Sequence, residues 1–540
     1  MRMTNKIMQN NSLHNINNNK VLQDKLSTQM STQKKITRPS DDPVIAIRAL
    51  RLRSDVSQIK QYYEKNAPDA ESWIKVTADA LNTTTEVIYN MIEQSNKGSN
   101  KDLGADTLEI IITQLKSLRD EFYATGNVDF AGRYVFTGYR TDTTLTYTED
   151  TKEEFKITEQ LNISAIDTIN YTNIGALKGI SKENYDPANP ATSAISDTTI
   201  ENSNIYRIRL SYDKLKDGVP NLTQVTDATT VPPTTAPLFP TWTPSSPPMP
   251  TVISKSLNGT DNPYEYILLN PQQAVLIPET GELLIGAELY EKMTDEGNSD
   301  YYVNPNAEIR VEYTKDSWKE GDLRPQHYFA CESDGIEYNY NKYMDETVTP
   351  PVEKGYISKE GVSQVIQYDV GYNQKIRINT TAGEVFTLDV DRNIDDMVNA
   401  LEALKEIDKS RTNLKKMLDG LEEETTEYDK VKATYDAADK AYTYIRENMQ
   451  KMFEGLTTKI QGALSTTNVA ITDNGTRGSR LDLITNRLMT QKTTFQTLQS
   501  SNEDVEITEV TIQLTSMNYS YQSALMATSK ILQNSLMHYI

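Results

Sequence analysis

Residues 52–91 read LRSDVSQIKQYYEKNAPDAESWIKVTADALNTTTEVIYNM and carry the strongest helical pattern in the chain. Steps of three and four residues along it reach twelve positions, of which nine are apolar or aromatic. These positions are Leu52, Val56, Ile59, Tyr63, Asn66, Ala70, Trp73, Thr77, Ala80, Thr84, Val87 and Met91. Such a sustained heptad pattern predicts a long helix that packs along its length against other helices, as in a coiled coil.

Segments with the same spacing follow this seam and recur near the other end of the chain. Asn96, Gly98 and Ser99 predict a break in the first long helix. The spacing then restarts at Leu108, Ile111, Leu115, Leu118 and Phe122. Three further apolar runs, in residues 428–456, 481–498 and 510–531, predict more helices. Both ends of the chain are therefore expected to be helical.

The sequence Pro39-Ser40-Asp41-Asp42-Pro43 marks the start of the long helix. Asp41 or Asp42 can accept hydrogen bonds from the free N–H groups of the first helical turn. Pro43 fits the first helical position because a missing N–H costs nothing there. A paired-carboxylate site is the alternative interpretation, but capping explains every residue of the motif.

A weaker amphipathic stretch precedes this motif. Its apolar positions are Ile7, Leu13, Ile16, Leu22, Leu26 and Met30. An Asn-rich segment at residues 15–19 interrupts it, and asparagine is a poor helix former. We therefore expect this stretch to be marginal or disordered on its own.

The middle of the chain, roughly residues 138–391, has β character. Runs rich in β-branched and aromatic residues predict strands at 144–147, 205–212, 266–269, 274–277, 309–313 and 385–390. Residues 278–281 predict a turn between two strands. Eight of the 21 prolines fall in residues 231–250, which predicts an extended connector or exposed loop between two β lobes.

Together these patterns predict an α+β fold, in which both termini build an elongated helical coiled-coil rod with β-rich outer domains inserted into it. Terminal assembly helices are expected at residues 1–40 and 501–540, and a helical rod domain at 41–138 and 392–500. The outer lobes are expected at 139–230 and 251–391, joined by the Pro-rich connector at 231–250.

The composition argues against several classes of protein. A net charge of −21 argues against a nucleic-acid binder, which needs basic surface to neutralise phosphates. The single cysteine, Cys331, allows neither an internal disulfide nor a CxxC site, and no phosphate-binding glycine motif occurs. His327 lies four residues before Cys331, but no third group orients a thiol–imidazole pair. We therefore expect no cofactor and no metal.

Membrane insertion and secretory signals are not expected either. No apolar run approaches the length that a spanning helix needs. Residues 1–30 lack the apolar core of a secretory signal peptide.

Charge is distributed unevenly between the two ends. Residues 1–60 hold 11 Lys and Arg against 4 Asp, whereas residues 501–540 hold one Lys against four acidic residues. This difference predicts that the basic N-terminal segment pairs with the acidic C-terminal one, in the same or a neighbouring subunit. Two independently solvated faces would give the same composition.

The ends of the chain resemble the flagellin superfamily, and within it the hook-associated protein 3 family of the bacterial flagellar hook–filament junction. The resembling N-terminal residues are 36–50, which begin Ile-Thr-Arg-Pro-Ser-Asp-Asp-Pro, then Gln61, Tyr62, Asn66, Ala70, Trp73, Ile74 and 132–138. The resembling C-terminal residues are 480–482, 486–488, 503–505 and 535–540, Ser-Leu-Met-His-Tyr-Ile. Pro43 and this ending favour the junction family over filament flagellins. The Asn-rich segment at 15–19 departs from the family pattern.

The resemblance implies a structural protein and not an enzyme, located outside the cell in the flagellum. It would be exported unfolded by the flagellar type III system and become ordered on assembly. The implied partners are hook-associated protein 1, flagellin, copies of itself in a junction ring and a cytosolic export chaperone. The alternatives are a filament flagellin and, remotely, a carbohydrate-active enzyme in the β-rich middle.

The apolar runs, the capping motif and this resemblance together predict an assembly interface in the terminal regions. Its expected residues are Leu13, Ile16, Leu26, Pro39, Asp41, Asp42, Pro43, Leu514, Met517, Tyr521, Ile531 and Leu536.

Overall fold

The computed structural model describes residues 5–187, 195–227, 234–239, 252–259, 261–296, 302–304, 307–338, 343–345, 352–354 and 364–536. The chain forms two compact units. Unit 1 comprises Met1–Ser72, Tyr368–Ile376 and Gly478–Ile540, and unit 2 comprises Trp73–Gln367 and Arg377–Arg477. Long helices at both ends and a strand-rich middle confirm the predicted α+β class.

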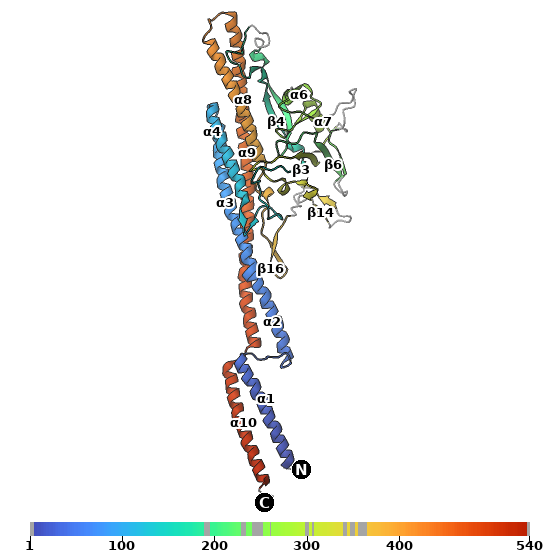
Figure 1. Ribbon diagram of the computed structural model, residues 1–540, viewed down its shortest axis with the longest axis vertical. Coiled ribbons are helices and arrows are strands. Elements are labelled where there is room, and N and C mark those ends of the chain that lie inside the picture. The colour runs from blue at the N-terminus through green and yellow to red at the C-terminus, as the bar shows by residue number, and fades with distance from the viewer. Residues whose placement is uncertain are drawn as a thin grey trace. The chain divides into compact units, whose positions relative to one another are not determined.

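Unit 1 is built from helices that both ends of the chain contribute (Figure 1). The N-terminal part supplies α1 (Asn5–Thr32), α2 (Pro43–Gln61), the π-helical turn η1 (Tyr62–Asn66) and the first residues of α3 (Ala67–Gly98). The C-terminal part supplies the last residues of α9 (Thr426–Glu503) and α10 (Ile507–Leu536). Most of the hairpin of β16 (Gln367–Gly371) and β17 (Gln374–Arg377) also belongs to this unit.

The π-helical turn contacts two other elements of unit 1. Asn66 at its end donates from Nδ2 to the carbonyl oxygen of Asp369 in β16, at 2.7 Å. Glu64 in the same turn pairs with Lys492 of α9, at 2.7 Å. The turn therefore fastens both the hairpin and α9 to the N-terminal helices.

Helices α3, α4 (Ala105–Ala124), α8 (Asp389–Leu418) and α9 supply the helical part of unit 2. The predicted seam of α3 is buried here at Trp73, Thr77, Ala80, Thr84, Val87 and Met91. The predicted break is confirmed, because α3 ends at Gly98. A Cβ on Gly98 would lie 2.2 Å from the ring of Phe453, so the end of α3 approaches α9 too closely for a side chain.

Two sheets form the β-rich part of unit 2. The first has the order β4-β5-β10-β9-β8, with β4 at Ile166–Thr172, β5 at Asn202–Arg209, β8 at Val252–Ser254, β9 at Ala274–Ile277 and β10 at Glu282–Ile285. The second has the order β13-β12-β3-β11-β6-β7, with β3 at Phe155–Leu161, β6 at Asn221–Asp227, β7 at Thr234–Pro237, β11 at Ile309–Lys315, β12 at Ala330–Ser333 and β13 at Ile336–Tyr338. The pairings within them are antiparallel except that of β8 with β9, which is parallel.

Smaller elements surround these sheets. They are the strand pairs β1 (Asp129–Phe130) with β2 (Arg133–Tyr134) and β14 (Tyr343–Asp345) with β15 (Val352–Lys354), and the helices α6 (Pro263–Leu269) and α7 (Ala287–Thr294).

One apolar core joins the two sheets. Ile157 of β3 and Val311 of β11 belong to the same buried cluster as Ile208 of β5 and Leu276 of β9. A second cluster packs α6 against the opposite face of the first sheet. Because β9 and β10 are covered on both faces, all four residues of each strand are buried.

The predicted division into two β lobes is wrong. β5, which precedes the Pro-rich segment, pairs with β10, which follows it, and β3 pairs with both β11 and β12. Residues 231–233 and 240–250 of the predicted connector lie outside the described residues. Residues 234–237 form β7 at the edge of the second sheet, where a proline is tolerated because no N–H is needed on the free side.

Three strand predictions are also wrong. Residues 266–269 lie in α6, which Asn262 caps and Pro263 starts. Residues 385–390 follow a short 3₁₀ helix and run into the first turn of α8. In residues 144–147 only an isolated bridge from Thr146 to Leu323 forms. The strands predicted at 274–277 and 309–313 are confirmed, and most of 205–212 lies in β5.

Candidate functional site: the paired terminal helices

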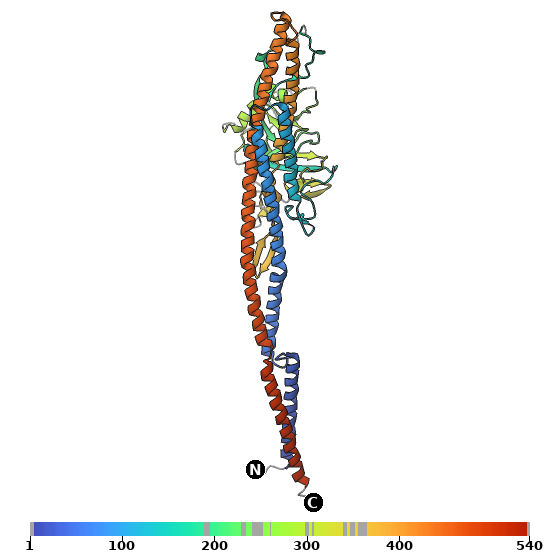
Figure 2. The same cartoon turned by 90° about the vertical axis from the view of Figure 1, so that its left-hand side faces the viewer.

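Helices α1 and α10 lie side by side in unit 1 and run antiparallel (Figures 1 and 2). An antiparallel bridge joins Lys34, just after α1, to Asp504, just before α10. Its main-chain bonds run from Lys35 N to Glu503 O at 2.7 Å and from Val505 N to Gln33 O at 3.1 Å. Two helices from opposite ends of the sequence therefore form one hairpin-like pair.

The faces that α1 and α10 turn toward each other mix apolar and polar side chains. The half-buried or buried positions of α1 with heptad spacing are Ser12, Ile16, Asn19, Gln23 and Leu26. Those of α10 are Val510, Leu514, Met517, Asn518, Tyr521, Ala524 and Thr528. Gln23 donates from Nε2 to Asn518 Oδ1 at 2.6 Å, so an amide pair lies within the seam.

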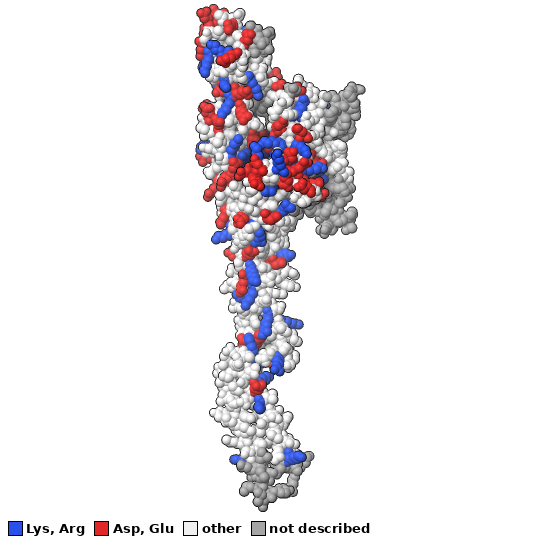
Figure 3. All heavy atoms as spheres, viewed as in Figure 1, with Lys and Arg blue, Asp and Glu red and all other residues white. Residues whose placement is uncertain are grey.

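Further apolar side chains of both helices point to solvent. On α1 they are Ile7, Leu13, Val21, Leu22 and Met30, and on α10 they are Ile507, Ile512, Tyr519, Leu525 and Met526. Val21 is 70% exposed and Met526 is 71% exposed. The face drawn in Figure 3 carries few charged side chains over this pair. Helices that are apolar on several faces normally lie buried among other helices.

The predicted assembly residues fall in different settings. Ile16 and Leu26 of α1 and Leu514, Met517 and Tyr521 of α10 lie in the seam between the two helices. Leu13 instead points to solvent and is 55% exposed. Ile531 and Leu536 lie in the last turns of α10, but their side chains are outside the described residues.

The connector between α1 and α2 contains the predicted helix cap. Asp42 accepts hydrogen bonds on Oδ1 from the N–H groups of Val44 and Ile45, at 2.9 and 3.1 Å. Pro43 occupies the first turn of α2. These contacts confirm the predicted cap and assign it to the second aspartate of the motif.

Asp41 has a different partner set. Its Oδ2 accepts from the N–H groups of Arg38 and Thr37, at 2.9 and 3.1 Å, which closes the turn that contains Pro39. These backbone hydrogen bonds, that of Arg38 first, lower the pKa of Asp41. The two carboxylates of the motif therefore shape the backbone and do not form a paired acid–base site.

Glu503, the last residue of α9, forms ion pairs with basic side chains of the N-terminal segment. Arg53 of α2 donates from Nε and from a terminal nitrogen to its two carboxylate oxygens, at 2.8 and 2.6 Å. Lys34 lies 3.7 Å from Glu503 and also pairs with Asp504. The Arg53 hydrogen bond lowers the pKa of Glu503, and the Lys34 hydrogen bond lowers that of Asp504. The basic and acidic ends therefore meet within one chain, but these ion pairs lie beside the connectors and not between α1 and α10, the terminal helices that the charge distribution predicts to pair.

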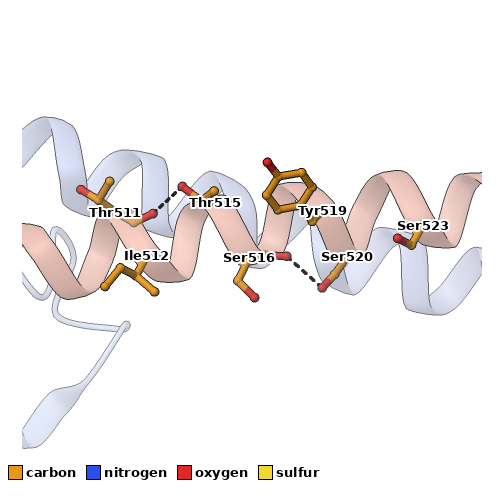
Figure 4. A pocket seen from close by; sticks show the side chains of 7 residues that line it. All are labelled: Thr511, Ile512, Thr515, Ser516, Tyr519, Ser520 and Ser523. Carbon is orange, nitrogen blue, oxygen red and sulfur yellow. Dashed lines mark hydrogen bonds between the residues drawn. The ribbon is translucent and has the colours of Figure 1, made fainter.

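A groove of about 760 Å³ lies on the exposed face of α10 (Figure 4). Its lining residues are Thr511, Ile512, Thr515, Ser516, Tyr519, Ser520 and Ser523. The hydroxyls of Thr515 and Ser520 donate to carbonyl oxygens one turn earlier in the same helix. The lining contains apolar and hydroxyl groups and no acid–base pair, which suits contact with another protein better than chemistry on a substrate.

Residues with metal-binding or nucleophilic chemistry also occur in the described part of the chain outside these helices. Across the described ranges, no group of three or more His, Cys, Asp or Glu side chains is placed to hold a metal ion. In unit 2, burial lowers the pKa of His327 to about 4 and raises that of Cys331 to about 12. A thiol that stays protonated is not an effective nucleophile. Within the part of the chain that the structure describes, no helix combines the length and apolar character needed to cross a membrane.

Comparison with known proteins adds an independent observation on the N-terminal part. The bacterial flagellin N-terminal helical region matches residues 3–141. Flagellar hook-associated protein 3 of Escherichia coli (strain K12) is 32% identical over 144 residues, which are 26% of this chain and 45% of that protein. The protein of the same name from Salmonella typhimurium (strain LT2) is 32% identical over 143 residues, again 26% of this chain and 45% of the relative. The chain thus spans less than half the length of these two curated relatives.

A solved structure shows a weaker likeness. The flagellar junction protein FlgL from Legionella pneumophila superimposes with a TM-score of 0.24 and 10% sequence identity, over 81% of this chain and 99% of that one. A TM-score of this size carries no argument about the fold. The sequence matches, in contrast, cover α1, the connector, α2 and α3, and they confirm the resemblance predicted from these residues.

Proposed function

We propose, from the premise that residues 3–141 carry the flagellin-type N-terminal helical region, that this chain is a structural subunit of the bacterial flagellum that joins the hook to the filament. The observation that carries the proposal is the α1–α10 pair of unit 1, whose helices expose apolar side chains after they have packed against each other. Such a pair is incomplete until other helices cover it.

The energetics favour ordering on assembly. Full burial of one aliphatic or aromatic side chain is worth about 1.5–3 kcal/mol, so covering several of the exposed ones would outweigh what the seam alone supplies. Within the seam, Leu26 is buried, whereas Ile16, Leu514 and Met517 are only half-buried. The isolated pair is therefore marginal, and neighbouring subunits would complete its core.

This proposal assigns the partners that the resemblance implies. Hook-associated protein 1 would meet the chain on the hook side, flagellin on the filament side, and copies of the chain would form a ring between them. Before export, a cytosolic chaperone would cover the exposed face of α10, where Ile512 and Tyr519 line the groove. The assembled protein would lie outside the cell and would act by contact and not by catalysis. The single cysteine leaves no internal disulfide to open before unfolded export.

Substitution on the exposed faces tests the proposal. Val21→Gln combined with Met526→Gln should leave the fold of unit 2 intact but produce cells with hooks and no attached filaments. Asn17→Ala, on an exposed polar position of α1, is the matched control and should leave motility unchanged. Normal filament attachment in the double variant would count against the proposal.

A filament flagellin is the second candidate, because the matched region is defined as flagellin's own. The two candidates differ in self-assembly. Long filaments formed by the purified chain alone would favour the filament subunit, whereas a junction subunit should need a hook-side partner and should form no long filament by itself.

A further inference from the structure

Gln23 occupies a seam position of α1 at which coiled coils usually place an apolar residue, and it is bonded to Asn518, a half-buried residue next to the seam position Met517 of α10. We propose that this pair is a specificity determinant, which selects α10 as the partner of α1 and fixes the register in which the two helices pack. A polar residue at one seam position is a known means of setting register and partner choice at a cost in stability.

The hydrogen bond places residue 23 level with residue 518 in an antiparallel pair. The buried and half-buried positions fit the same register to within one residue. Leu26 with Leu514, Asn19 with Tyr521 and Ser12 with Thr528 are level when Gln23 is level with Met517, the neighbour of Asn518.

A slip of one heptad would separate the two amides. In one direction, Gln23 would come level with Thr511 and Asn518 with Ile16. In the other direction, Gln23 would come level with Leu525 and Asn518 with Met30. Each slipped register therefore removes the hydrogen bond between the two amides, and the first also places Asn518 against the half-buried Ile16.

The backbone bridge between Lys34 and Asp504 also favours the observed register, but it cannot select a partner by sequence. Main-chain groups make that bridge, and any extended segment could supply them. Gln23 lies about three turns away from the bridge along α1, and its contact is made by side chains. The amide pair is thus the contact that another apolar helix would fail to reproduce.

Disulfide trapping on the full-length isolated chain tests this proposal. In a Cys331→Ser background, Ser12→Cys with Thr528→Cys reports the observed register, and Asn19→Cys with Thr528→Cys reports a slip of one heptad. With both amides present, we expect the first pair to cross-link about 10-fold faster than the second, because a tenfold preference corresponds to the net worth of one hydrogen bond. With Gln23→Leu and Asn518→Leu, the ratio should fall toward one while helical content is retained.

A matched control adds the same apolar groups outside the seam. Asn17→Leu with Gln522→Leu, both at exposed positions, should leave the cross-linking ratio unchanged. An unchanged ratio in the Gln23→Leu, Asn518→Leu variant would overturn the proposal, as would the absence of any preference with both amides present. Cross-linking traps the molecules in which α1 and α10 have paired, so the ratio can be measured on the isolated chain although the pair is marginal there. Its outcome is separate from whether the chain works at the flagellar junction.

Discussion

Arg53 of α2 and Glu503 of α9 lie 450 residues apart in sequence and are joined by two hydrogen bonds of 2.8 and 2.6 Å. The side chain of Glu503 is 3% exposed, whereas that of Arg53 is more than half exposed. Glu503 also accepts the main-chain hydrogen bond from Lys35 N, so this ion pair stabilises the place where the N-terminal and C-terminal segments meet in unit 1.

Removing the charge of Glu503 should loosen this meeting point. Glu503→Gln leaves Arg53 without its carboxylate, whereas Lys34 keeps Asp504. We expect the free energy of unfolding to fall by about 1 kcal/mol, because solvent around the exposed Arg53 screens part of the interaction. Hydrogen exchange at residues 33–35 and 478–503 should become faster by the factor that corresponds to this loss of free energy. The exposed Glu506→Gln is the control, and equal exchange in the two variants would show that the ion pair contributes nothing.

Acidification should weaken the same contact. The pKa values of Glu503 and Asp504 are lowered in the folded chain, chiefly by their hydrogen bonds to Arg53 and Lys34. Their contribution is therefore fully present above the ordinary carboxyl range, about pH 4, and is lost as the pH falls through the lower folded values. Protection of residues 33–35 should drop as the pH falls from about 4 to about 2, after correction for intrinsic exchange. Constant protection over that range would contradict this.

Unit 2 should respond to pH with the opposite sign. Burial raises the pKa of Glu159 to about 7, against the hydrogen bonds donated by Tyr313 and by the N–H of Ser211, and burial raises that of Asp391 to about 6 beside Asp395. The folded state then binds protons that the unfolded state releases, so the free energy of unfolding should rise as the pH falls from 8 through these values.

Urea unfolding followed by tryptophan fluorescence checks this, because the tryptophans at 73 and 318 both belong to unit 2. Glu159→Gln should make the free energy of unfolding less dependent on pH near pH 7, and the exposed Glu332→Gln should not. A flat wild-type profile between pH 8 and pH 5 would be the contrary result.

Replacement of two helical glycines by alanine should change the stability of unit 2 in opposite directions. At Gly98 a Cβ would lie 2.2 Å from the Phe453 ring, so Gly98→Ala should destabilise unit 2 by about 1–3 kcal/mol through overpacking. At Gly455, inside α9, a Cβ meets nothing within 4 Å, so Gly455→Ala should stabilise by about 0.5–1 kcal/mol through helix propensity. Thermal unfolding followed by circular dichroism measures both, and a stabilised Gly98→Ala would show that α3 and α9 do not approach closely there.

The terminal segments should be protease-sensitive before assembly and protected after it. Residues 1–35 and 505–540 depend on a pair with few buried apolar side chains, so the isolated subunit should lose them to limited proteolysis while unit 2 persists. If both segments resist proteolysis in the isolated subunit, ordering does not depend on assembly.

Local patterns in the sequence were sufficient to predict the helices and some of the strands. The seam that contains Trp73 and Met91 predicts α3 because heptad spacing is a local signal, and Ala-Val-Leu-Ile at 274–277 predicts β9 for the same reason. The cap at Asp42 and Pro43 follows from the chemistry of the first helical turn.

The sequence does not indicate which distant segments pair. The pairing of β5 with β10 joins residues on either side of the Pro-rich segment, so the two predicted lobes are one. Strand propensity carries no information on which strands pair. The buried Arg207, bonded to Asp167, Glu282 and Asp396, draws its partners from distant positions that no motif connects. The apolar character of Leu13 predicts an assembly contact, but only the rotation of α1 determines that Leu13 points to solvent and not toward α10.

Immunogold labelling of intact flagella tests the central proposal most directly, with an antibody raised against unit 2 of this chain. A subunit that joins hook to filament should give label confined to a narrow band where the hook ends, and the band should disappear in a strain that lacks this chain. Label distributed along the whole filament, or absent from flagella altogether, would contradict the proposal.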